Sequence, residues 1–494
     1  MGAMIDSCNA EENHKLEAFY QHKELNAFGK IAYIDTGSLK SQSLSEHFLY
    51  RHILEYVNLY EDFKDINLLE FCSIVLPIGI DEYFLSLFRD KILHYLQSGG
   101  VVLSFMSDFE RILPHSSGYI QSAMPIVKRV VKFEKSQSAN IIFEGVRKYD
   151  INYRMGVKGF FNRGYFDVSE LPDSIEWILS DNEGRCVGYI DADSTNGVML
   201  LTANADLLSF GLFDNTTARK MGLNLLKWLL QTLQKKDYKA LRQKATQYPN
   251  NDDVSRIPVE SYLNFKADKS KQSLSRPELK NAIITGGGSF HRYFFSNKNA
   301  KYAHFFSKRC HFLHLDSLNF NDFDYIVLAS RLNVKYLNPH KQKFLDYLQN
   351  GGHIISFGEI MGDYLPNVIW KDYEVNFWWW LIDGANMPLY ALDVNGEKTE
   401  EKTTQGLFSK IPVSVAKWHC HGAFYPPQNA QKILINELDE SIIYKDTSFK
   451  GNLYITSLDP EFHLGQGFMP TTEPFFDAFM QWVEEDILRT KGNL

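Results

Sequence analysis

The feature that most constrains this chain is an internal repeat. Residues 93–105 read LHYLQSGGVVLSF, and residues 345–357 read LDYLQNGGHIISF. Matching residues recur in the same order at one constant spacing: Leu93, Tyr95, Leu96, Gln97, Gly99, Gly100, Ser104 and Phe105 against Leu345, Tyr347, Leu348, Gln349, Gly351, Gly352, Ser356 and Phe357. A second block agrees at nearly the same spacing, with Gly197, Thr202, Thr217 and Trp228 against Gly451, Thr456, Thr471 and Trp482. Two ordered blocks predict two diverged copies of one domain in tandem.

Each copy alternates short apolar runs, typical of buried strands, with amphipathic segments. The predicted strands are 30–35, 73–79 and 101–106 in copy one and 281–285, 324–330 and 353–358 in copy two, and the predicted helices are 44–59, 82–97 and 336–349. This alternation predicts βαβ units and a mainly parallel sheet. Later apolar runs within 175–206 and 433–458 predict additional, partly antiparallel strands, and Trp228 and Trp482 lie in closing helices.

These patterns divide the chain into four parts. We expect an N-terminal extension at 1–29, copy one at 30–232, a polar connector at 233–280 and copy two at 281–494. The opening Met-Gly-Ala-Met resembles a remnant of expression.

Composition excludes several classes of protein. The net charge of −8 argues against a duplex nucleic-acid binder, which usually has a basic surface. The chain contains no run of about 18 apolar residues, so we expect no membrane span. Its 5 cysteines include no CxxC pair, which favours a reducing compartment. The polar N-terminal segment is unlike a secretory signal, and we expect a cytoplasmic protein.

The order of several segments resembles a known superfamily. DYIVLAS, a helix ending in LQNGG, HIISFG leading into a tight turn, and the later GLFSKIPVSVAKWHCHGAF and GNLYITSLDPEFHLGQGF are similar to the class I glutamine amidotransferase-like fold, in its ThuA-like branch. The resemblance covers roughly 30–232 and 281–490. It implies an α/β protein of two tandem flavodoxin-like domains with mainly parallel central sheets.

The residue that amidotransferases of this superfamily need is missing. Their nucleophilic Cys stands on the turn after the third strand, where Phe105-Met106-Ser107 and Phe357-Gly358-Glu359 stand in this chain. No His–acid pair follows Ser107 in the sequence. We therefore expect no classical glutamine hydrolysis, with copy one degenerate and copy two holding any site.

Polar residues gather after the strands of copy two, where open α/β sheets bind ligands. Glu359, His419, His421 and Asp459 are the candidate catalytic residues, and His463 is a candidate ligand contact. Two histidines and two carboxylates could provide acid–base chemistry or hold a divalent metal, so metal dependence stays open. Structural histidines remain the alternative. No organic cofactor is predicted.

A glycine-rich loop follows the first strand of copy two. Successive backbone N–H groups of Gly286, Gly287, Gly288 and Ser289 could cradle an anion or a sugar hydroxyl, with His291 and Arg292 adding positive charge. The loop lacks the spacing of a P-loop. A plain tight turn is the alternative.

Two hypotheses for function remain. In the first, copy two binds, and in one version hydrolyses, a small polar metabolite, such as the carbohydrate that the ThuA-like resemblance implies. In the second, both copies are inactive scaffold, and Trp378, Trp379 and Trp380 contact a protein partner. The segment 301–310, KYAHFFSKRC, is interpreted as an amphipathic helix with a solvated face.

Overall fold

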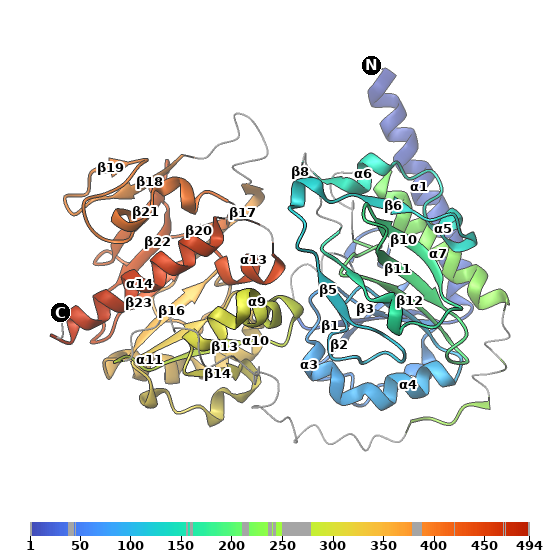
Figure 1. The fold of residues 1–494 in the computed structure, drawn as a ribbon, viewed down its shortest axis with the longest axis horizontal. Coiled ribbons are helices and arrows are strands. Elements are labelled where there is room, and N and C mark those ends of the chain that lie inside the picture. Colours follow the sequence, from blue (N-terminus) through green and yellow to red (C-terminus); the bar gives the residue numbers. More distant parts are fainter. Residues whose placement is uncertain are drawn as a thin grey trace. The chain divides into compact units, whose positions relative to one another are not determined.

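Runs of Ile, Val and Leu form the central strands of two mixed sheets in the computed structural model. The structure describes residues 2–37, 44, 46–154, 157–158, 162–209, 217–235, 240, 244–248, 278–377, 388–418, 420–467, 469 and 471–492. The chain divides into unit 1, Met1–Ile257, and unit 2, Pro258–Leu494 (Figure 1).

The main sheet of unit 1 has a parallel half and an antiparallel half. In spatial order its strands are β2 (Leu54–Asn58), β1 (Ile31–Asp35), β3 (Ser73–Leu76), β4 (Val101–Ser104), β12 (Val198–Thr202), β11 (Cys186–Asp191), β10 (Glu176–Asp181) and β6 (Val131–Phe133). The first five are parallel and the rest antiparallel. Short strands β5 (Tyr119–Gln121) and β9 (Gly164–Phe166) extend it, and β7 (Tyr153–Arg154) pairs with β8 (Val157–Lys158).

Unit 2 repeats the same order. Its strands run β14 (Lys308–His311), β13 (Asn281–Thr285), β15 (Tyr325–Leu328), β16 (His353–Phe357), β23 (Leu453–Thr456), β22 (Ser441–Asp446), β21 (Gln431–Asn436), β18 (Leu389–Leu392) and β19 (Lys398–Thr399), with β17 (Trp370–Phe377) and β20 (Cys420–Phe424) alongside. Again the first five strands are parallel and those that follow are antiparallel. The sheets are therefore mixed, rather than mainly parallel throughout as the sequence predicted.

Helices connect the strands of each unit. Unit 1 contains α1 (Gly2–Asn26), α3 (Glu82–Leu85), α4 (Arg89–Gln97), α5 (Gln137–Ile142), α6 (Lys148–Asn152) and α7 (Ala218–Lys235). Unit 2 contains α9 (Ser289–Phe305), α10 (Val334–Leu337), α11 (Lys341–Gln349), α12 (Leu407–Lys410), α13 (Pro460–Gln466) and α14 (Thr472–Thr490). Trp228 lies in α7 and Trp482 in α14, as predicted.

The repeated residues make the same contact in both units. Tyr95 donates its hydroxyl to Phe71 O at 3.3 Å, and Tyr347 donates to Phe323 O at 3.0 Å. A Cβ on Gly100 would lie 2.3 Å from the Tyr95 ring, and one on Gly352 would lie 2.1 Å from the Tyr347 ring. The repeat therefore preserves a backbone-to-ring contact that only glycine allows.

The glycine of the second repeated block completes this contact. A Cβ on Gly197 would lie 2.2 Å from Gly100 O, and one on Gly451 would lie 1.7 Å from Gly352 O. The two sequence blocks thus match because they pack against each other within each unit.

Two predicted helices are wrong in part. Residues within 44–59 form turns that are followed by the edge strand β2. In β2 the buried residues Leu54 and Val57 are three positions apart, a spacing that is also typical of a helix. The segment 301–310 begins in α9, but the helix ends at Phe305 and β14 follows. Both errors fall on the second strand of a unit, which is exposed along one side.

No helix among the described residues is both long enough and apolar enough to cross a membrane. Residues 249–277 of the predicted connector lie outside the described residues.

Candidate functional site

Four small residues lie side by side at the carboxyl ends of the parallel strands of unit 2. Counting on from the paired residues Ile284 and Leu328 places Gly286 beside Ser330. The same register places Ser330 beside Gly358 and Gly358 beside Ser457. We call these four residues the edge row. It includes the ends of β13 and β15, where the strand order reverses and where open α/β sheets bind ligands.

Close packing within the edge row depends on glycine. Gly358 has a φ of 77°, and a Cβ at this position would lie 2.6 Å from the Cβ of Ser330. A larger residue would therefore collide with Ser330 and strain the backbone. The turn after β16 can accordingly hold no side chain at this position.

Glu461 contacts the edge row from α13. The backbone N–H of Ser330 donates to Glu461 Oε1 at 2.6 Å, and Glu461 is 0% exposed. Burial, followed by the charge of Asp459, raises the pKa of Glu461 to about 7, although the N–H and the nearby hydroxyl of Ser330 oppose the rise.

Asp459 interacts with the side chains of Arg331 and His463. Its Oδ2 accepts from Arg331 Nη2 at 3.1 Å, and its Oδ1 lies 3.1 Å from His463 Nε2. Asp459 and His463 are each 2% exposed. Arg331 has a φ of 61°, a left-handed conformation that is uncommon outside glycine and often marks a functional position.

A second pair lies close to Arg331. His421 Nδ1 is 3.4 Å from Glu359 Oε1, and both side chains are 15% exposed. Burial alone would lower the pKa of Arg331, but Glu359, Asp459 and Glu461 together raise it above its ordinary value. Glu359, His421, Asp459 and His463, four of the residues predicted from sequence, thus lie around one guanidinium group.

The glycine-rich loop meets α13. α9 begins at Ser289 with Gly288 as its N-cap, and the N–H of Gly286 donates to His291 Nδ1 at 3.2 Å. The Phe290 ring packs edge-on against Phe462 at 4.7 Å. The guanidinium of Arg331 lies 3.8 Å from the centre of the Phe462 ring. Arg292 is half-buried in the first turn of α9.

Several buried polar atoms at this edge form no hydrogen bond with the described residues. They are Thr285 Oγ1, Ser330 Oγ, Ser457 Oγ and Glu461 Oε2, and each belongs to a side chain no more than 1% exposed. Buried polar groups in folded proteins nearly always have a partner, which can be a protein atom, water or a ligand. These atoms at the strand ends of unit 2 are candidates for contact with a polar molecule.

A cysteine does lie near this edge in space. The buried Cys420 thiol is close enough to Asp459 and Glu359 for their charges to act on it. Burial comes first, and with those charges it raises the pKa of Cys420 well above its ordinary value. The thiol stays protonated and is a poor nucleophile. In unit 1 the Ser107 hydroxyl is buried and forms no hydrogen bond with the described residues, so no base activates it there.

In the described part of the chain, no arrangement of side chains supports the hypothesis of a metal site. No group of three or more His, Cys, Asp or Glu side chains there is arranged to hold a metal ion. His419, the fourth candidate catalytic residue, lies outside the described residues, as do Trp378, Trp379 and Trp380.

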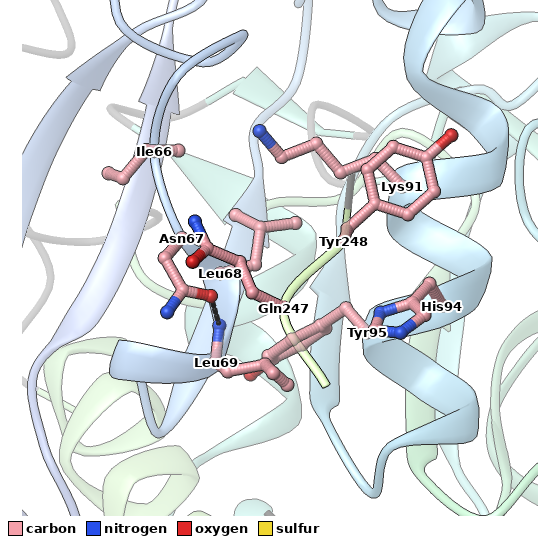
Figure 2. Close-up of a pocket in the computed structure, with 9 residues that line it drawn as sticks. All are labelled: Ile66, Asn67, Leu68, Leu69, Lys91, His94, Tyr95, Gln247 and Tyr248. Carbon is pink, nitrogen blue, oxygen red and sulfur yellow. Dashed lines mark hydrogen bonds between the residues drawn. The ribbon is translucent and has the colours of Figure 1, made fainter. Parts of the chain in front are cut away.

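Unit 1 has a separate small pocket (Figure 2). It lies beside α4 and before the start of β3, away from the carboxyl ends of the strands. Lys91 donates there to the carbonyls of Phe63 and Lys64, each at 2.7 Å, and Tyr248 packs near His94 with ring centres 5.6 Å apart. None of the residues predicted from sequence lines this pocket.

Three residues of the edge were missing from the predicted site. Ser330 was predicted only as the end of the strand 324–330, and Arg331 was not singled out. Glu461 follows the same strand as Asp459 and His463 but was not among the candidate site residues. The strand order supplies the signal, because Ser330 ends the strand that borders the glycine-rich loop.

Comparison with known proteins gives little more. No protein-family model matches the chain. No curated protein matches it. Among solved structures it is similar to a protein from Thermoplasma acidophilum described as a candidate GMP synthase component, with 8% identity over 43% of this chain and 99% of that chain and a TM-score of 0.26.

It is also similar to the exo-beta-1,4-mannosidase Op5Man5 from Opitutaceae bacterium strain TAV5, with 9% identity over 96% of this chain and 90% of that chain and a TM-score of 0.22. Both likenesses are too weak to assign a family or an activity. The finding that stands is an α/β chain of two units with two mixed sheets in one strand order.

Proposed function

We propose that unit 2 binds a small polar metabolite at the edge row, and that the parallel halves of both units derive from an amidotransferase-like, flavodoxin-like ancestor. The observation that carries the binding proposal is the set of unpartnered buried polar atoms around Gly286, Ser330, Gly358 and Ser457. The ligand would complete the hydrogen bonds that these atoms lack.

The charges at the edge favour an uncharged ligand. Glu359, Asp459 and Glu461 surround Arg331, whose guanidinium already bonds to Asp459. An anion would meet three carboxyl groups and one neutralised cation. A polyhydroxylated molecule such as a carbohydrate can instead donate to the carboxylates and accept from Arg331.

The neighbouring groups suit such a molecule in two further ways. Phe462 offers an apolar ring beside Arg331, and apolar rings pack against the faces of sugars. Glu359, His421 and Asp459 are ionisable groups that would hold or transfer a proton at the bound ligand. His463 and the N–H groups of Gly287 and Gly288 would orient it, because the Gly286 N–H already donates to His291. Hydrolysis of the ligand is the catalytic version of this proposal.

A thermal-shift screen tests the proposal. Neutral sugars and polyols, their phosphate esters, and amino acids are each added to the full chain, and the rise in Tm is measured. We expect neutral polyhydroxylated compounds to raise the Tm, and the double variant His419→Ala/His421→Ala to reduce that rise. Absence of any rise with every neutral compound contradicts the proposal, as does a rise that this double variant leaves intact.

A matched pair of acidic residues controls for charge. Glu359→Gln changes the edge, whereas Asp363→Asn changes a nearby carboxylate that is 80% exposed and pairs with Lys341 at the surface. We expect the first variant to weaken the ligand-induced shift and the second to leave it unchanged. Equal behaviour of the two variants would mean that Glu359 does not contact the ligand.

A further inference from the structure

Glu461 is the most deeply buried of the three carboxyl groups around Arg331. It is 0% exposed, and one of its oxygens is bonded to the backbone N–H of Ser330. The Ser330 hydroxyl lies close enough to Glu461 to lower its pKa, yet among the described residues neither this hydroxyl nor the other oxygen, Oε2, makes a hydrogen bond of ordinary geometry. Two neighbouring buried polar atoms are thus left to meet the same ligand.

The groups that face Glu461 do not favour an ionised carboxylate. Arg331 donates its hydrogen bond to Asp459 rather than to Glu461, and His463 also pairs with Asp459. Glu359 pairs with His421 on the other side of Arg331. Within the described residues no ion pair includes Glu461, and the charge that acts most strongly on it is that of the like-charged Asp459.

We propose that Glu461 is kept as a neutral carboxylic acid, and that its O–H and the Ser330 hydroxyl together donate to one uncharged oxygen of the bound metabolite. This inference rests on the proposed function and names the group of the ligand that Glu461 recognises: a hydroxyl, ether or carbonyl oxygen. The proton stays on Glu461 in the resting protein. Asp459, which two partners stabilise, remains the ionised member of the pair.

The cost of burying an ionised carboxylate supports a neutral Glu461 beside an ionised Asp459. An ionised carboxylate with one unbonded oxygen, buried beside a second carboxylate, is costly, whereas a neutral acid needs only an acceptor. A carboxylic acid held neutral in a buried site can donate a hydrogen bond that an ionised one cannot. Glu461, with a pKa of about 7, is protonated through most of the range below neutral pH.

The experiment compares Glu461→Gln with Glu440→Gln across pH. Glu440 is a buried carboxylate of the same unit that is bonded to Lys371, Tyr373 and Tyr425, and its pKa is lowered to about 2. The folded-state pKa of Glu461 is raised, so wild-type stability must fall as pH rises from about 4.5 to 7. Glutamine keeps the acceptor for Ser330 N–H but does not titrate.

We expect Glu461→Gln to match wild type near pH 5 and to be more stable at pH 8. Its advantage in the unfolding equilibrium should grow on the order of 100-fold over that range. Glu440→Gln should be less stable than wild type at pH 8, with the loss shrinking as pH falls towards 2. A constant difference between wild type and Glu461→Gln from pH 5 to 8 would overturn the proposal.

A second variant keeps the test decisive if Glu461→Gln does not fold. Ser330→Ala leaves Glu461 and the backbone bond in place but removes the hydroxyl that lowers its pKa. We expect its stability to fall over a wider pH range than that of wild type, because the fall still begins near 4.5 but ends at a higher pH. An unchanged profile would count against the pairing.

The screen of neutral ligands separates this inference from the proposed function. A ligand-induced shift without the pH difference rejects the role of Glu461 alone. The pH difference without any ligand-induced shift rejects binding and leaves Glu461 as a structural acid.

Discussion

The strand registers show which residues of unit 1 correspond to the edge row of unit 2. Thr36, Ile78, Met106 and Ala203 correspond to Gly286, Ser330, Gly358 and Ser457. The strands are arranged alike, yet one edge carries Ile78 and Met106 and the other carries only small residues. Met106 is 1% exposed, whereas a Cβ on Gly358 would lie 2.6 Å from the Cβ of Ser330. The same arrangement of strands thus holds a large buried side chain at this position in unit 1 and none in unit 2.

Unit 1 nevertheless keeps acidic residues near its strand ends, namely Asp35, Glu82, Asp108 and Asp206, all of them buried. The expectation that copy one is degenerate therefore needs refinement. Glu82 accepts from the N–H groups of Ser107 at 2.8 Å and Phe109 at 2.9 Å. A side chain of the protein itself takes up the backbone donors on the turn after β4, so those donors are closed to a ligand.

The largest expected effect comes from removing this internal acceptor. Glu82→Ala should lower the free energy of unfolding by about 4 kcal/mol, because two buried N–H groups lose their partner. Val334→Ala, at the corresponding position of unit 2, should cost about 1 kcal/mol. Urea denaturation measures both. Equal losses would mean that Glu82 does not close the edge of unit 1.

Gly358→Ala tests the close packing of the edge row in unit 2. The new Cβ would collide with Ser330 and strain a backbone with a φ of 77°, so we expect a loss of about 3 kcal/mol. The control is Gly396→Ala, where φ is 80° but no atom lies within 4 Å of the added Cβ. This variant should cost only about 1 kcal/mol in thermal denaturation. A similar cost for both would show that Ser330 can move aside.

Asp108→Asn asks whether the buried acids of unit 1 titrate as Glu461 does. Burial raises the pKa of Asp108 to about 7, against hydrogen bonds from Ser116, Ile112 and Leu113. Wild-type stability should therefore fall as pH rises from about 4 to 7. The variant does not titrate, so at pH 8 its free energy of unfolding should be about 2 kcal/mol higher than that of wild type. Asn also tolerates the φ of 51° at this position. A gain that is independent of pH would point to the backbone alone.

The smallest effect belongs to the contact that both units share. Tyr95→Phe and Tyr347→Phe each remove one hydroxyl bonded to a carbonyl, and each should cost about 1 kcal/mol. Hydrogen exchange followed peptide by peptide assigns each loss to its own unit. A loss in one unit only would show that the two copies no longer share this contact.

The sequence predicted the repeat, the central strands and the closing helices because their apolar runs and Gly-Gly stops have clear periods. β2 was missed because its buried residues Leu54 and Val57 have a helical spacing, and β14 because it follows α9 closely in the sequence. The sequence predicted that polar segments after the strands of copy two could converge, since strand ends meet at one edge of a parallel sheet. The structure places Glu359 near His421 and Asp459 near His463. Whether they bind a ligand stays a prediction.

Ser330, Arg331 and Glu461 could not be found in the same way. Their importance depends on which strands are adjacent and on which oxygen lacks a partner, and neither property is local in sequence. Arg331 in particular bonds to Asp459, which lies far along the chain at the N-cap of α13.

The ring of Tyr95 over Gly100, repeated by Tyr347 over Gly352, also bears on how such a chain diverges after duplication. Positions squeezed between a backbone and an aromatic ring tolerate almost no change, whereas the tips of the strands can drift as long as they stay packed. The similarity between the two units is therefore best kept at the amino ends of the strands, and the differences lie at the carboxyl ends. We therefore expect relatives of either half to keep the Tyr, the two glycines and the distant glycine that packs on them, and to vary at the carboxyl ends of the strands.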